Sequence, residues 1–186
     1  MMGLSAAAVF LTSSSLTLTR VVEAQQGRFL GFLPHWNCFP QILGCIIFII
    51  CAFAETNRLP FDLPEAEAEL VAGYHTEYSA FKFAMFFMGE YANLIAASAL
   101  ITTLYFGGWS FPYLAKLGVG TVLYGVVSIL VFALKTAVFI WIFIWVRWTL
   151  PRFRYDQLMS LGWKVFLPLS MVNLLFVAAL VVAGKL

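Results

Sequence analysis

Long apolar stretches separated by shorter polar links dominate the chain. A helix that crosses about 30 Å of hydrocarbon needs about 20 residues, because each residue adds about 1.5 Å to its length. Five stretches approach that length, and they set the expected helices at 3–19, 38–56, 79–106, 119–147 and 161–183. The pattern therefore predicts an all-α, polytopic transmembrane helix bundle of about five spans, built as a single transmembrane domain over 1–186.

The first two stretches are the least regular of the five. Residues 3–19 contain Ser13, Ser14 and Ser15, and hydroxyl side chains of this kind are common between helices inside a membrane bundle. In 38–56 the dense apolar run covers only 42–54, so we expect this helix to tilt or to be covered at its ends by its neighbours.

Composition supports a membrane protein and excludes several other classes. Hydrophobic residues make up 62% of the 186 residues and charged residues 11%, so much apolar surface must face lipid or apolar partners. A net charge of +2 without a basic run argues against a nucleic-acid partner. Cys38, Cys45 and Cys51 lack the paired spacing of a metal site, and we expect Cys45 and Cys51 to act as small apolar residues.

The distribution of Lys and Arg predicts the orientation in the membrane. The acidic link 57–78 and the link after Arg147 should lie on one side, with 20–37 and the turn at Gly107-Gly108-Trp109 on the other. The first side carries the larger number of basic residues: Arg58, Lys82, Arg147, Arg152, Arg154 and Lys164, against Arg20, Arg28, Lys116 and Lys185. The acidic loop after the second span is therefore expected in the cytoplasm or its organellar equivalent.

The acidic link concentrates groups that exchange protons. Six of the nine acidic residues lie between 55 and 79. Asp62 is expected to cap a helix whose first turn contains Pro64 and Glu65. On that helix Glu65 and Glu69 fall on one face while Glu67 points elsewhere. Desolvation and like-charge repulsion raise the pKa of crowded carboxyls, so such a cluster can take up and release protons near neutral pH. The alternative is a solvated acidic loop with ordinary carboxylates.

Two charged residues are expected deep in the membrane. Glu90 in the third stretch and Lys135 in the fourth each lie roughly 16–18 Å from the membrane surface if the helices are straight. Charges at that depth usually face a bundle interior or a watered cavity. We therefore predict that Glu90 and Lys135 interact, directly or through water, as a proton relay, and the alternative is a static ion pair.

The end of the second stretch combines charge with apolar surface. Glu55 and Arg58 lie where the helix leaves the membrane, and Arg58 directly precedes Leu59-Pro60-Phe61. A fixed cation beside apolar side chains suits an amphiphilic ligand with a polar head. The alternative is that Arg58 only anchors the helix end.

Three blocks of sequence resemble one family. Glu55-Thr-Asn-Arg-Leu-Pro-Phe-Asp-Leu-Pro-Glu-Ala-Glu67 is followed by Glu69-Leu-Val-Ala-Gly-Tyr-His-Thr-Glu-Tyr-Ser79, and the second block is Lys82-Phe-Ala-Met-Phe-Phe-Met-Gly-Glu-Tyr-Ala-Asn93. The third, 147–168, contains Pro151-Arg-Phe-Arg-Tyr-Asp-Gln-Leu-Met-Ser-Leu-Gly-Trp-Lys164. All three closely resemble the family of the quinone-site membrane subunit of respiratory complex I, which is the H subunit of NADH-quinone oxidoreductase.

The resemblance implies a function at the junction of the hydrophilic and membrane arms of that complex. It implies that Glu55, Glu65, Glu67, Glu69 and Glu90 belong to a chain of acidic residues leading into the membrane. Arg58 and Asp62 would line the quinone chamber. The subunit would carry no redox centre and would be inactive alone, with quinone as substrate and with FMN and iron–sulfur clusters on partner subunits.

Family members are nearly twice as long, so this chain resembles their C-terminal half. The apolar start has no basic residue before it and differs from a secretory signal, which favours the C-terminal part of a longer family protein. The expected location is the inner (plasma) membrane of a bacterium, or alternatively an organellar inner membrane, with lipid and the other complex I subunits as partners. A related energy-converting hydrogenase, a proton-linked transporter and a pure scaffold are the competing functions.

Overall fold

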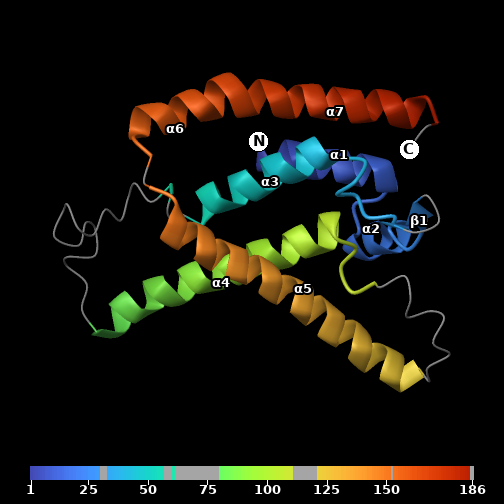
Figure 1. Cartoon of the computed structure of the whole chain (residues 1–186), viewed down its shortest axis with the longest axis horizontal. Helices are drawn as coiled ribbons and strands as arrows, with labels where there is room; N and C mark the ends of the chain where they lie inside the picture. The colour runs from blue at the N-terminus through green and yellow to red at the C-terminus, as the bar shows by residue number, and fades with distance from the viewer. Residues whose placement is uncertain (30–32, 57–59, 62–79, 111–120, 152, 185–186) are drawn as a thin grey trace.

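The computed structural model in Figure 1 describes residues 1–29, 33–56, 60–61, 80–110, 121–151 and 153–184. Its helices are α1 Met2–Ser13, α2 Leu18–Ala24, α3 Ile42–Glu55, α4 Ala80–Tyr105, α5 Thr121–Thr149, α6 Tyr155–Leu161, the π-helical turn η3 Gly162–Phe166, and α7 Leu167–Val182. The predicted all-α fold is confirmed. One small addition is an antiparallel pair of two-residue strands, β1 Arg28–Phe29 and β2 Leu33–Pro34, within the first polar link.

Three predicted spans appear as long apolar helices. They cover Phe81–Tyr105, Val122–Thr149 and Tyr155–Val182, with 25, 28 and 28 residues. The last is α6, η3 and α7 joined into one helix, which begins earlier than the predicted 161–183. Helices of 25 and 28 residues are about 38 and 42 Å long, so all three exceed the hydrocarbon thickness of about 30 Å and must tilt or project from it.

The first two stretches form shorter helices than the expected 3–19 and 38–56. Residues 3–19 break at Ser14, whose φ of 49° is left-handed, and α1 and α2 meet at a bend of 62°. Ser13, Ser14 and Ser15 explain the break, because hydroxyl side chains offer the backbone hydrogen bonds that compete with the helix. Ser13 Oγ indeed bonds the carbonyls of Val9 and Phe10. Helix α3 has only 14 residues, so the described residues contain three spans, or four with the bent pair.

The helices lie in layers that Figure 1 shows side on. The α6–α7 helix runs along one side, α1 and α3 lie next to it, and α4 and α5 cross on the far side. Aromatic side chains fill the contacts between the layers: the rings of Phe53 and Phe143 stack at 4.0 Å, and those of Phe48 and Tyr105 are 5.5 Å apart. Cys45 is buried in this core, which confirms that it acts as a small apolar residue.

The C-terminal end of α4 is capped by side chains from other elements. The last carbonyls of a helix have no partner within the helix. Gln25 Nε2 donates to the carbonyls of Thr103 and Leu104 at 3.2 Å, and Asn37 Nδ2 donates to that of Leu104 at 3.0 Å. The predicted turn after α4 is also confirmed, since Gly107 and Gly108 both have positive φ values, 71° and 51°.

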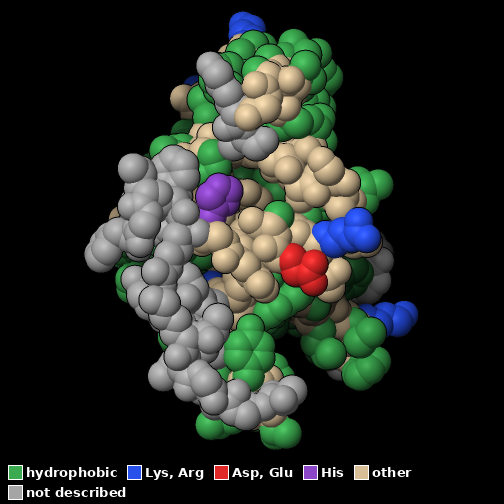
Figure 2. Space-filling model, turned by 90° about the vertical axis from the view of Figure 1, so that its right-hand side faces the viewer, with side chains coloured by type: hydrophobic (Ala, Val, Ile, Leu, Met, Phe, Trp, Pro, Cys, Tyr) green, Lys and Arg blue, Asp and Glu red, His purple; other side chains and the backbone are tan. Residues whose placement is uncertain are grey.

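The side of the bundle on which α2 and β1 lie faces the viewer in Figure 2. Backbone, uncharged polar atoms and a few charged side chains occupy the middle of the face, while apolar side chains gather above and below them. A polar end between apolar flanks is what a bundle presents where its turns leave the membrane.

Candidate functional site

Two of the predicted acidic residues, Glu55 and Glu90, lie at the end of the bundle opposite to the capped end of α4. Glu55 is the last residue of α3, and its backbone carbonyl accepts a hydrogen bond of 3.3 Å from Asn93 Nδ2 of α4. Glu90 lies one helical turn before Asn93 on α4. The side chain of Glu55 is exposed and that of Glu90 is half-buried. Glu55 thus lies at the contact between α3 and α4, and Glu90 lies one helical turn from that contact.

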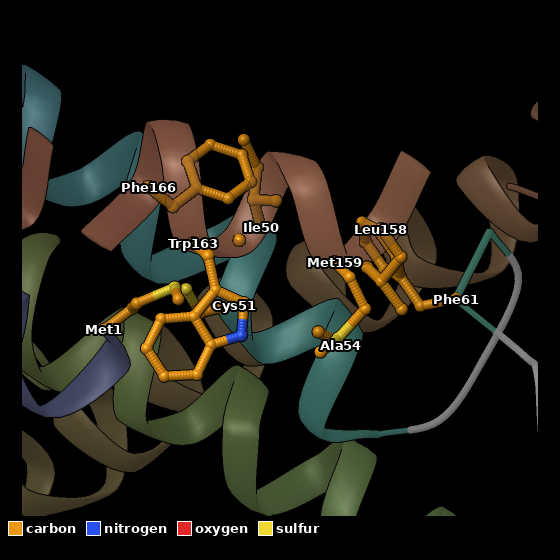
Figure 3. A pocket seen from close by; sticks show the side chains of 10 residues that line it. Met1, Ile50, Cys51, Ala54, Phe61, Leu158, Met159, Trp163 and Phe166 are labelled. Carbon is orange, nitrogen blue, oxygen red and sulfur yellow. The ribbon is translucent and has the colours of Figure 1, made fainter. Parts of the chain in front are cut away.

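An apolar pocket of about 250 Å³ lies beside the same end of α3. Figure 3 shows its side chains converging from α3, from Phe61 and from the α6–η3 helix. The lining residues are Met1, Ile50, Cys51, Ala54, Phe61, Leu158, Met159, Gly162, Trp163 and Phe166. Small-molecule sites are usually concave and mostly apolar, with few polar groups at their edge.

A π-helical turn forms part of the pocket wall. Gly162, Trp163 and Phe166 all come from η3, between α6 and α7. Such turns are rare and occur frequently at functional sites. No local pattern in the sequence indicates this turn: the apolar run predicts a regular helix from 161 onward, and Trp163 stands out only through the family resemblance.

The start of the acidic segment is held against the chain that leads into α6. Phe61 is buried, and its ring stacks on that of Phe153 at 5.7 Å. The amide of Phe153 donates a 3.1 Å hydrogen bond to the carbonyl of Pro60. These contacts bring the first and third of the resembling sequence blocks together. Arg58, Asp62, Glu65, Glu67 and Glu69 lie outside the described residues.

A second hollow lies on the other side of α3. It has a volume of about 500 Å³ between α1, α3 and α4, and Glu55 and Asn93 line it together with Phe10, Phe48 and other apolar side chains. The Glu55 end of α3 therefore lies between two apolar hollows.

The predicted contact between Glu90 and Lys135 is wrong. Lys135 Nζ donates to the carbonyls of Phe106, Gly108 and Ser110 at 2.8, 3.0 and 2.9 Å, and it lies 4.9 Å from the centre of the Trp36 ring. Phe106 follows Glu90 by 16 residues in the chain, which is about 24 Å along a helix.

The reason lies in how α5 is placed. Equal depth in the membrane requires two straight neighbours that start level with each other. In Figure 1 α5 crosses α4, and its first turns project past the end of α4. Lys135 is consequently level with the C-terminal end of α4, where its cation offsets the negative end of the helix dipole.

These features define a class of protein: a polytopic membrane protein with two carboxylates and an apolar pocket at one end of a helical bundle. Comparison with known proteins identifies the family. The model of the NADH dehydrogenase family matches residues 1–178, so the chain belongs to this family.

Curated relatives agree with this assignment. The H subunit of NADH-quinone oxidoreductase from Protochlamydia amoebophila is 52% identical over 95% of this chain and 49% of its own length. The H subunit of the Bdellovibrio bacteriovorus enzyme is 44% identical over 100% of this chain and 54% of its own length. NADH-quinone oxidoreductase subunit 8 of Rhodothermus marinus is 49% identical over 95% of this chain and 53% of its own length. The chain spans about half the length of the curated relatives it matches.

Proposed function

We propose that this chain is part of the membrane subunit of a proton-pumping NADH:quinone oxidoreductase in a bacterial membrane. In this proposal it contributes to the quinone-binding chamber and to the acidic path that couples quinone reduction to proton translocation. The NADH dehydrogenase family match over residues 1–178 supports the complex, and the relatives named above are bacterial. Electrons would arrive through FMN and iron–sulfur clusters on partner subunits.

The observation that carries the quinone proposal is the position of the apolar pocket. Its wall is made of Ala54, Phe61, Trp163 and neighbouring apolar side chains. Ala54 belongs to α3, and Glu55 is the last residue of that helix. An amphiphile could place its apolar tail in this pocket while its polar head lies toward the charged segment that contains Phe61. Arg58 and Asp62 are the residues that we propose for the head group, from their place in that segment.

The acidic path is proposed to start in the same segment. Glu65, Glu67 and Glu69 would exchange protons as the charge of the quinone changes, and Glu55 and Glu90 would continue the path toward α4. The hydrogen bond between the Glu55 carbonyl and Asn93, one helical turn after Glu90, supports this order. Lys135 has no place in it, because its three N–H donors are used by backbone carbonyls at the far end of α4.

A substitution that fills the pocket tests the quinone proposal. Ala54→Trp places a large side chain on the pocket wall, and Ile46→Trp is the matched control, since Ile46 is an exposed residue of α3 outside the pocket. The assay is NADH:quinone oxidoreduction by the intact complex in membranes, with a long-tailed quinone and with a tail-less quinone.

We expect Ala54→Trp to raise the KM for the long-tailed quinone by about tenfold, equivalent to about 1.4 kcal/mol of lost contact. The KM for the tail-less quinone should stay unchanged, and Ile46→Trp should resemble the wild type with both. Equal kinetics of the Ala54→Trp variant and the wild type with the long-tailed quinone would remove the pocket from the quinone path.

A further inference from the structure

Two buried amide side chains between α3 and α7 each have one unpaired polar atom. Gln41 at the start of α3 is 2% exposed, and Asn173 of α7 is 6% exposed. Gln41 Oε1, an acceptor, and Asn173 Nδ2, a donor, have no hydrogen-bond partner among the described residues. Buried polar groups are nearly always paired with protein or with ordered water, so each of these two atoms calls for a partner.

Both atoms face the same small region beside Gly44. A Cβ added to Gly44 would lie 3.0 Å from Asn173 Nδ2, 3.6 Å from Tyr105 Oη and 3.8 Å from Gln41 Oε1. The polar atoms thus come from α3, the end of α4, and α7. Because Gly44 has no side chain, the region between them is left to a small group.

Gln41 and Tyr105 are also held by other hydrogen bonds. Gln41 Nε2 lies 3.4 Å from the carbonyl of Ala8 and 3.3 Å from Thr12 Oγ1, so a flip of the Gln41 amide would sacrifice both bonds. The Tyr105 hydroxyl donates to the carbonyl of Ser5 at 3.2 Å, which leaves its oxygen able to accept.

We propose that a single buried water molecule binds at Gly44 and bridges these three helices. The water oxygen accepts the hydrogen bond from Asn173 Nδ2, one of its protons goes to Gln41 Oε1, and the other goes to Tyr105 Oη. About three hydrogen bonds are typical of a buried water. A hydroxylic group is the smallest ligand that satisfies a donor and an acceptor together.

An apolar groove of about 300 Å³ lies between α3 and α7, beside the two amide side chains. Its wall includes Phe39, Leu43, Val172 and Phe176 together with both amide residues. The groove gives the water a route of exchange. Water, and not a lipid hydroxyl, is assigned because the two unpaired atoms are fully buried.

The bound water would join four helices into one polar network inside an apolar bundle. Through Gln41 it connects to α1, and through Tyr105 it connects to α4 and again to α1. Asn173 is the contribution of α7. The α6–α7 helix, which carries the wall of the apolar pocket at its other end, would thereby be fixed to the core.

A density map of the intact membrane complex in lipid nanodiscs, at a resolution that shows ordered water, tests the proposal. The expected result is an isolated peak about 2.7–3.2 Å from both Asn173 Nδ2 and Gln41 Oε1. Two results would overturn it: direct bonding of the two amides with no density between them, or density that continues along the groove as a lipid does.

Variants extend the test. Gly44→Ala, whose methyl group would lie 3.0 Å from Asn173 Nδ2, and Asn173→Leu should both lose the peak. Ser170→Ala is the matched control, because Ser170 is buried in the same helix but its hydroxyl bonds the Leu167 carbonyl at 2.8 Å. That variant should keep the peak. If a variant fails to assemble, the wild-type map alone still decides.

Discussion

Replacing Lys135 with methionine should destabilise the bundle strongly. The change keeps most of the apolar stem and removes the ammonium group, which donates to three carbonyls at 2.8–3.0 Å and lies over the Trp36 ring. Hydrogen bonds to a charged group contribute about 1.5–3 kcal/mol each, but three that share one cation are not additive. Because Lys135 is half-buried, we expect a loss of about 3 kcal/mol, the upper end of the cost of leaving one buried acceptor without a donor.

The measurement is the rate of irreversible thermal inactivation of the purified complex. If the cap forms late in folding, about 3 kcal/mol corresponds to inactivation that is roughly a hundredfold faster. Lys82→Met, at an exposed position of α4, is the control and should inactivate at the wild-type rate. A Lys135→Met complex with wild-type thermal stability but without proton pumping would refute the capping role and restore Lys135 to a proton path.

Three further substitutions test the packing around α4. Gly107→Ala should cost about 1–3 kcal/mol, since φ is 71° and the added methyl would lie 2.9 Å from Trp36, and thermal denaturation of the complex measures it. Gln25→Leu should cost about 2–4 kcal/mol by the same measurement, because it leaves the Thr103 carbonyl and the Gly107 amide without their buried partner. Phe143→Ala should cost about 3–5 kcal/mol through loss of the stacked contact with Phe53, whereas Trp141→Ala, at an exposed site of α5, should be much milder.

The long helices can be predicted from the sequence because their signal is local. Runs such as 79–106 and 119–147 are apolar enough to be helical in a membrane whatever they contact, and the structure places α4 and α5 within a few residues of them. The turn after α4 can also be predicted, because glycine adopts positive φ values at little cost and Gly107 and Gly108 both have them. The only sequence feature that indicates the bend at Ser14 is a run of hydroxyl residues.

The partners of the charged groups cannot be predicted in this way, because they depend on how helices cross. Two residues at equal distances from the ends of their helices are not neighbours when one helix is displaced along the other. For this reason the sequence pattern pairs Lys135 with Glu90 and not with carbonyls at 106–110. The roles of Gln25, Asn37 and Asn93 escape sequence reasoning for the same reason. Their hydrogen bonds join segments 38 to 79 residues apart, and no local pattern reveals such contacts.

Glu90→Gln tests the central claim, that carboxylates at the α3–α4 junction couple quinone reduction to proton movement. The complex would be reconstituted in liposomes, and NADH oxidation by quinone and acidification of the lumen would be measured together. Glu23→Gln, at an exposed site in α2 near the opposite end of the bundle, is the control and should behave as the wild type. We predict that Glu90→Gln lowers the number of protons moved per NADH oxidised, whereas wild-type oxidation with wild-type acidification would contradict the account and leave this chain as a scaffold.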